Sequence, residues 1–253
     1  SLQAGLRVDR VDARRFTVAR LHPRTTTPTM SVGTPALLVL TMWWACETAF
    51  RPAARRRFGA ELTDGYPRWR VALGCLTQIV IFPLMFLVFV IGRQPWLMES
   101  FLLVFGCSLL QDCVRFPRTM GPLLLLHHAA CLVGLLVARF GAGPEWRAVF
   151  PYFHCGCTAL ELGSGACNVY WLRCLPLRQS ELLYHLAMSA SNAVAVACVG
   201  EWVVHAQAHV ATRGFAAAAI AVLGLLRQKE SNAHCRVSRW HWLGQAGPSD
   251  KYL

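Results

Sequence analysis

Charged residues are scarce in this 253-residue sequence: they make up 15% of the chain, whereas soluble domains carry about 25%. Acids are the scarcer kind, with 13 Asp and Glu against 25 Lys and Arg. A chain that is 55% hydrophobic cannot be disordered, collagen-like or a small secreted disulfide scaffold. The basic residues lie at the ends of long apolar segments, which excludes a nucleic-acid-binding surface. The composition therefore predicts an all-α integral membrane protein with several spans.

Metal-binding cysteine patterns are also lacking. No pair of the eleven cysteines has the spacing of a zinc knuckle or of a C-x-x-C redox motif. Eight of them lie within or at the edge of apolar runs, where a thiol behaves as a small apolar residue. We therefore expect structural cysteines, no metal site and no firmly implied cofactor.

Long apolar runs are abundant. A membrane-spanning helix needs about 20 mostly apolar residues. The candidate segments are 34–50, 71–92, 95–112, 121–139, 148–172, 182–204 and 213–227. Because the first and last are short, we expect six to seven transmembrane helices, with Pro83 kinking the second.

The charged segments divide the chain into parts. These are an Arg-rich N-terminal tail (1–33), a first helix with a basic loop (34–66), a main domain (67–230) and a basic C-terminal tail (231–253). The N-terminal part is typical of a disordered tail, or alternatively of a cleaved targeting segment. Basic loops are enriched on the cytosolic side, and their alternation places the C-terminus in the cytosol. That orientation would put the basic N-terminal tail on the opposite side, so whether 34–50 spans the membrane stays open.

Two adjacent histidines, His127 and His128, follow a run of four leucines in the fourth segment. Ionisable side chains inside a membrane are costly and face a bundle interior or a cavity, so they are functional candidates. Neighbouring residues on a helix point about 100° apart, so both imidazoles can border one cavity. A buried histidine serves as a general base, a metal ligand or a hydrogen-bonded packing group.

A second polar pattern lies in the fifth segment. His154, Glu161 and Asn168 are separated by seven and seven residues, and with a drift of about 20° per heptad they share one helix face. Thr158 joins them one turn after His154, and small residues lie between. We therefore predict a central helix with an inward polar stripe. Such stripes also hold helices together, but a carboxyl group at Glu161 favours a functional site.

These residues resemble the TLC-domain family, named for the translocating-chain-associated, longevity-assurance and neuronal-ceroid-lipofuscinosis proteins. The matching pieces are Leu110-Gln111-Asp112 at the end of a segment, His127-His128 fifteen residues later, and Thr158 to Ser164, continuing to Asn168 and Trp171-Leu172. The resemblance covers roughly residues 67–230.

The resemblance implies an endoplasmic-reticulum membrane protein whose helices surround a central cavity for a lipid or acyl chain. His127, His128 and Glu161 would be the catalytic candidates. The residues expected to line the cavity or bind substrate are Asp112, His154, Thr158 and Asn168. In the ceramide-synthase branch the double histidine is followed by an H-D-x-x-D segment, but the stretch from His154 to Thr158 lacks both acids. The chain is thus more similar to the small TLC-domain-containing proteins, which are associated with lipid homeostasis.

Two functions of different classes remain. In the first, the cavity binds a lipid or acyl chain and the protein influences membrane lipid composition without making bonds. In the second, it is an acyltransferase with acyl-CoA as co-substrate: His127 or His128 would be the general base and Glu161 would hold the protonated imidazole. Membrane lipids are the expected partners in both, and a homo- or hetero-oligomer stays open.

Overall fold

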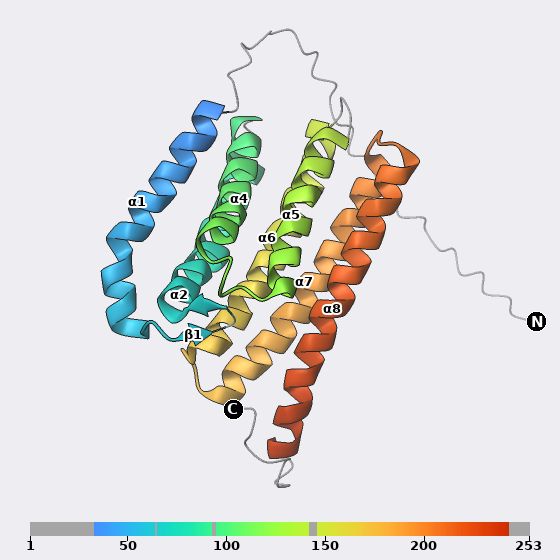
Figure 1. Ribbon diagram of the computed structural model, residues 1–253. Helices are drawn as coiled ribbons and strands as arrows, with labels where there is room; N and C mark the ends of the chain where they lie inside the picture. The colour runs from blue at the N-terminus through green and yellow to red at the C-terminus, as the bar shows by residue number, and fades with distance from the viewer. Residues whose placement is uncertain (1–32, 64, 93–94, 142–145, 243–253) are drawn as a thin grey trace, which may run out of the picture. The chain divides into compact units, whose positions relative to one another are not determined.

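The computed structural model describes residues 33–63, 65–92, 95–141 and 146–242, and nearly all of them are helical (Figure 1). In these ranges, five helical segments are long and apolar enough to cross a membrane. The segments are Arg68–Gly92, Trp96–Arg115, Leu124–Gly141, Leu177–His205 and Val210–His234. The prediction of an all-α membrane protein is therefore confirmed, while the predicted tail over 1–33 lies outside the described residues except for Gly33.

Every predicted apolar segment is helical. The helices are α1 Gly33–Phe58, α2 Arg68–Leu76, the π-helix η1 Thr77–Ile81, α3 Phe82–Gly92, α4 Pro95–Arg115, α5 Pro122–Gly141, α6 Trp146–Leu172, α7 Leu177–His205 and α8 Val210–Trp242. Two short strands, β1 Leu62–Thr63 and β2 Tyr66–Pro67, form an antiparallel hairpin between α1 and α2. These five segments are fewer than the six to seven transmembrane helices predicted, because α1 and α6 do not qualify in the described residues. In α6 the polar stripe lowers the mean hydropathy.

The predicted end of the first segment at residue 50 is wrong, because α1 continues to Phe58 into the predicted basic loop. Arg51 lies one turn after Glu47 and pairs with it at 3.7 Å. The three arginines of the last turn also suit the negative end of the helix dipole. Gly59, at φ +84°, ends the helix, and its N–H donates to the Arg55 carbonyl. This left-handed conformation is the usual helix stop, and glycine adopts it without strain.

The helix α8 is much longer than the predicted segment 213–227. It continues through residue 231, where we predicted the tail to begin, and ends at Trp242. The cause lies at Arg227, which the sequence placed at the cytosolic end of the segment. Its guanidinium is hydrogen-bonded to α6 and α7, so the charge does not need to leave the bundle.

Pro83 distorts the second segment in a specific way. The five residues before α3 form the π-helix η1, so the wider turn lies directly N-terminal to the proline. Proline has no N–H to donate to the carbonyl four residues earlier, and π-turns are a recognised way to absorb such an interruption. The same turn positions Gln78 toward α6.

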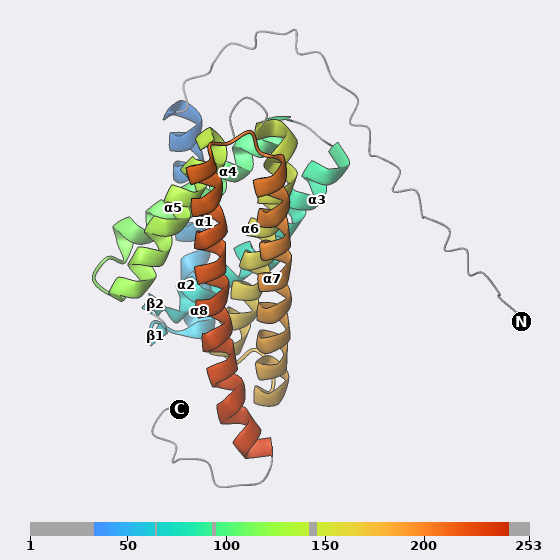
Figure 2. The same cartoon turned by 90° about the vertical axis from the view of Figure 1, so that its right-hand side faces the viewer.

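The helix α6 is central, as predicted: it contacts α2, η1, α3, α4, α5 and α7 (Figures 1 and 2). Small residues allow these contacts. A Cβ atom at Gly163 would lie 2.2 Å from Ser191 Oγ, and one at Gly165 would lie 2.6 Å from the Ile79 side chain. Neighbouring backbones therefore approach α6 more closely than any larger side chain permits.

The helix α5 is attached more loosely. It contacts α6 and α8 at few positions, whereas α6 and α7 pack along most of their length. Figure 2 shows α5 inclined away from the α6–α7–α8 group at its N-terminal end. This arrangement places the cavity described next beside α5.

Candidate functional site

A cavity of about 210 Å³ lies between α4, α5, α6, α7 and α8. Most of its wall is apolar, with Leu135, Phe153, Trp202 and Phe215 among the lining side chains. On α5 it extends from His127 to Ala138, about 16 Å at 1.5 Å per residue. It is therefore long and narrow, and it is smaller than the roughly 300–1,000 Å³ of a pocket that encloses a drug-sized ligand.

Polar groups border the cavity mainly at one end. They are His127 near the start of α5, Glu161 in the second half of α6 and Arg227 in the second half of α8. The start of α5 and the ends of α6 and α8 lie at the same end of the bundle (Figure 1). Three groups from three helices thus give the cavity a polar end and an apolar wall.

Arg227 is the most extensively bonded of the three. Its hydrogen bonds run from Nε to Asn192 Oδ1 (3.0 Å), from Nη1 to Ser164 Oγ (2.9 Å), and from Nη2 to the Leu160 carbonyl (2.9 Å) and Ser191 Oγ (3.3 Å). All four acceptors are neutral, so the positive charge of Arg227 is not cancelled by them. It acts on the Glu161 carboxyl group across the same cavity.

Glu161 is positioned from the opposite side by the π-turn. Asn168 donates to Gln78 Oε1 at 2.7 Å, and the Gln78 side chain lies close to the Glu161 carboxyl group. Since Oε1 accepts from Asn168, the Gln78 amide N–H is left to donate to Glu161. Asn168, a predicted cavity residue, therefore reaches the cavity only through Gln78.

The two adjacent histidines have different surroundings. His127 borders the cavity, and its Nε2 lies 3.7 Å from the Cys131 sulfur. His128 is not among the lining residues: its Nδ1 donates to the Leu124 carbonyl at 2.9 Å, and its Nε2 lies 3.1 Å from the Tyr66 hydroxyl. Both ring nitrogens of His128 are thus engaged within the protein, whereas His127 faces the space where a ligand would lie.

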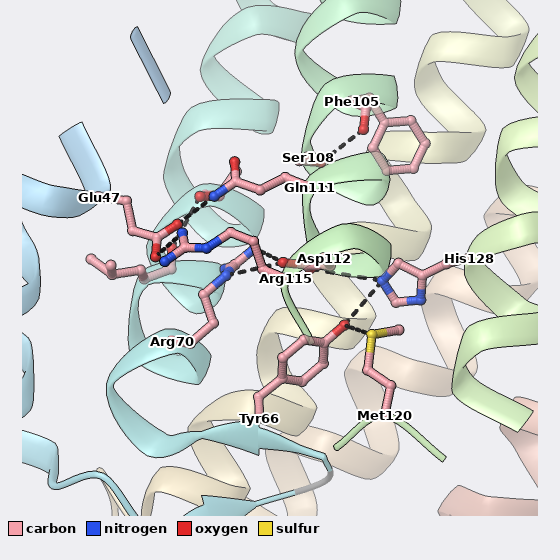
Figure 3. A network of polar contacts seen from close by, with 12 residues as sticks. Glu47, Tyr66, Arg70, Phe105, Ser108, Gln111, Asp112, Arg115, Met120 and His128 are labelled. Carbon is pink, nitrogen blue, oxygen red and sulfur yellow. Dashed lines mark hydrogen bonds and ion pairs between the residues drawn. The ribbon is translucent and has the colours of Figure 1, made fainter. Parts of the chain in front are cut away.

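Asp112 belongs with His128 (Figure 3). Its Oδ1 accepts from Arg70 Nη2 at 2.6 Å and from Arg70 Nε at 3.1 Å, and its Oδ2 lies 3.8 Å from His128 Nε2. Arg70 is 6% exposed and Asp112 9%, so this is a buried ion pair. It connects α2, α4 and α5 and does not border the cavity, contrary to the role expected for Asp112.

A second buried acid, Glu47, extends this network to α1. Its carboxyl group accepts from Gln111 Nε2 at 2.6 Å and pairs with Arg115, both on α4 (Figure 3). Glu47 is only 5% exposed. The two clusters hold α1, α2, α4 and α5 in register at the end of the bundle where the β-hairpin lies.

His154 and Thr158 lie outside the cavity as well. His154 is fully buried, and its ring centroid lies 3.8 Å from that of Phe101 and 5.3 Å from that of Phe150. Within the described ranges, neither ring nitrogen of His154 nor the Thr158 hydroxyl has a hydrogen-bond partner. The cavity face of α6 includes Cys157 and Glu161, so only Glu161 of the predicted stripe borders it.

Several residues of the site escaped the sequence analysis: Tyr66, Arg70, Gln78 and Arg227. For Arg227 the signal was its position inside an Ala- and Leu-rich helix, together with Asn192 and two serines on the preceding helices. For Gln78 the signal was a polar residue just before Pro83. In the described part of the chain, no three His, Cys, Asp or Glu side chains are grouped so that they could hold a metal ion.

Comparison with known proteins adds no relative: no protein-family model, curated protein or solved structure matches the chain. The fold and site define a helical membrane protein with a cavity that is polar at one end.

Proposed function

We propose that the protein binds a lipid or acyl chain in this cavity and thereby acts in lipid metabolism or lipid homeostasis, influencing membrane lipid composition. The observation that carries the proposal is the cavity itself, apolar along about 16 Å of α5 and polar where His127, Glu161 and Arg227 meet. A single hydrocarbon chain suits the apolar part, and a polar headgroup suits the other end. The rest of a larger lipid would lie in the bilayer.

The membrane arrangement is part of the proposal. The helix α6 crosses the bilayer inside the bundle, where its neighbours cover the polar stripe, and the helices surround the cavity as the TLC-domain resemblance implies. We infer from the many arginines near the end of α1 and the start of α2 that this end of the bundle faces the cytosol. The C-terminus would then be cytosolic and the membrane that of the endoplasmic reticulum. The loosely packed border between α5 and α8 offers lateral access to lipid.

The decisive variant is Gly134→Leu, which fills the cavity. Gly134 borders the cavity, and a Cβ atom there would meet nothing within 4 Å. We expect lipid affinity to fall about tenfold, because the ligand must overpack the site at a cost of roughly 1–3 kcal/mol. Stability should not fall, since replacing glycine within a helix gains about 1 kcal/mol. The measurement is labelling of purified protein in nanodiscs by a photoactivatable fatty acid.

Gly200→Leu is the matched control. Gly200 also has no atom within 4 Å of its Cβ position, but it lies on α7 away from the cavity lining. Its labelling should equal that of the wild type. Equal labelling of all three proteins would show that the cavity binds no acyl chain.

A second function, acyl transfer from acyl-CoA, is favoured by the positions of His127 and Glu161 on the wall of the same cavity. Here His127 is the general base, and His128 serves to position α5. We expect His127→Ala to lower transfer about a hundredfold or more at unchanged lipid binding. The measurement is the lipid profile of a host that lacks its own TLC-domain acyltransferases.

In the same host, His128→Ala should lower the amount of folded protein, because Tyr66 and Asp112 each lose one of their contacts. Activity per folded molecule should then be retained. A new acyl lipid made equally by the His127→Ala variant and the wild type would exclude His127 as the base.

A further inference from the structure

We propose that Cys131 is an acyl-accepting nucleophile in the cavity, activated by His127, and that it takes an acyl chain from acyl-coenzyme A as a covalent thioester. The inference rests on the proposed function, because the acyl chain must occupy the same cavity. It assigns a role to a thiol that the sequence pattern marked as structural.

The Cys131 and His127 side chains are in contact with each other. Cys131 lies one turn after His127 on α5, and its Sγ is 3.7 Å from Nε2 of the imidazole. Both side chains border the cavity. A thiol that donates to an unprotonated ring nitrogen can transfer its proton as it attacks, which is the arrangement of covalent Cys–His catalysis.

Two charged side chains also act on the Cys131 thiol. Cys131 interacts electrostatically with both Arg227 and Glu161. The guanidinium of Arg227 favours an anionic sulfur and the oxyanion that forms on the acyl carbonyl during attack, whereas burial of the thiol and the Glu161 carboxyl group oppose an anionic sulfur. The thiol proton must therefore pass to His127 as the sulfur attacks. Glu161 borders the same cavity as His127 and favours the imidazolium that forms when His127 takes the proton.

A comparison with other cysteines separates Cys131 from a merely buried thiol. Cys157 of α6 borders the same cavity, but in the described residues no histidine is hydrogen-bonded to it. Cys174 is exposed in the turn between α6 and α7, outside the cavity. Only Cys131 combines the cavity with a histidine base, so these two thiols are natural controls.

The proposed step is a thioester exchange. The Cys131 sulfur attacks the carbonyl carbon of acyl-coenzyme A while its proton passes to Nε2 of His127. The new bond between the Cys131 sulfur and the carbonyl carbon forms, the bond from that carbon to the coenzyme A sulfur breaks, and His127 returns the proton to the departing thiolate. One thioester replaces another, so no oxidant or reductant is needed.

The test uses the full-length protein in nanodiscs, incubated with alkyne-tagged palmitoyl-coenzyme A. Protein-bound acyl chain is quantified before and after neutral hydroxylamine, which cleaves thioesters. We expect hydroxylamine-sensitive labelling of the wild type and of the Cys157→Ala and Cys174→Ala variants, and its loss from Cys131→Ala. His127→Ala should slow labelling about a hundredfold, as expected for removal of a general base.

A photoactivatable fatty acid controls for folding, since it labels the cavity without a thiol. Cys131→Ala should bind it like the wild type. Full thioester labelling of Cys131→Ala would overturn the proposal. Absence of thioester from the wild type, with photolabelling of the cavity intact, would also overturn it while leaving lipid binding in place.

Discussion

Replacing Arg227 by methionine is expected to lower the free energy of unfolding by about 3 kcal/mol, one of the two largest effects predicted for this protein. A methionine side chain fills a volume similar to that of arginine but donates no hydrogen bond. The change removes four hydrogen bonds that join α8 to α6 and α7. It also leaves the Glu161 carboxyl group without the nearby positive charge. Unfolding by heat or SDS in a defined detergent measures the loss.

Lys229→Met is the matched control, because Lys229 is an exposed cation two residues further along α8. It should change stability by less than about 0.5 kcal/mol. Arg227→Lys should fall between the two, since it keeps the charge but loses the planar fork that reaches three acceptor side chains. If Arg227→Met is as stable as Lys229→Met, Arg227 does not hold α8 in the bundle.

Replacing Asp112 by asparagine is the second change with a large expected effect. It should lower the free energy of unfolding by about 3 kcal/mol. The amide has nearly the shape of the carboxylate but leaves the buried Arg70 guanidinium without its counter-charge. Because Asp112 is part of the link between α2, α4 and α5, the loss should appear in global unfolding. Lipid bound per folded molecule should change little, since Asp112 does not border the cavity.

Glu99→Gln offers the comparison. Glu99 pairs with Arg139 at 3.4 Å, but their side chains are 50% and 34% exposed, so this pair should contribute less than about 1 kcal/mol. The double variant Arg70→Met/Asp112→Leu should recover much of the loss, because it removes both charges together. An Asp112→Asn protein of full stability that no longer binds lipid would instead make Asp112 a ligand-binding residue.

Most of the helical architecture could be predicted from local sequence. Each apolar run became a helix, and the small residues of 163–166 correctly marked α6 as the central helix. The errors lie at helix ends. The helix α1 continues past residue 50 because the Arg51 side chain pairs with Glu47. The helix α8 continues past Arg227 because α6 and α7 accept hydrogen bonds from its guanidinium. Glu47 lies within the predicted segment 34–50, but hydropathy does not show that its side chain pairs with Arg51, and the partners of Arg227 are on other helices.

The candidate site was predicted only in part. His127 and Glu161 border the cavity, as the positions of polar residues in apolar helices suggested. Heptad spacing, however, could not show that the His154 side chain packs among phenylalanines while the Glu161 side chain borders the cavity. A small rotation of α6 decides between the two faces, and the neighbouring helices set that rotation.

The sequence by itself therefore determined the class of protein, the order of its apolar segments, and the polar residues that lie within them. These properties depend on side-chain hydropathy and on helix period, which are local. The tertiary structure decided that His127 borders the cavity while His128 binds Tyr66 and Asp112, and that Arg227 joins the site. Which histidine meets which partner depends on how each helix is rotated against its neighbours, because adjacent residues on one helix point about 100° apart.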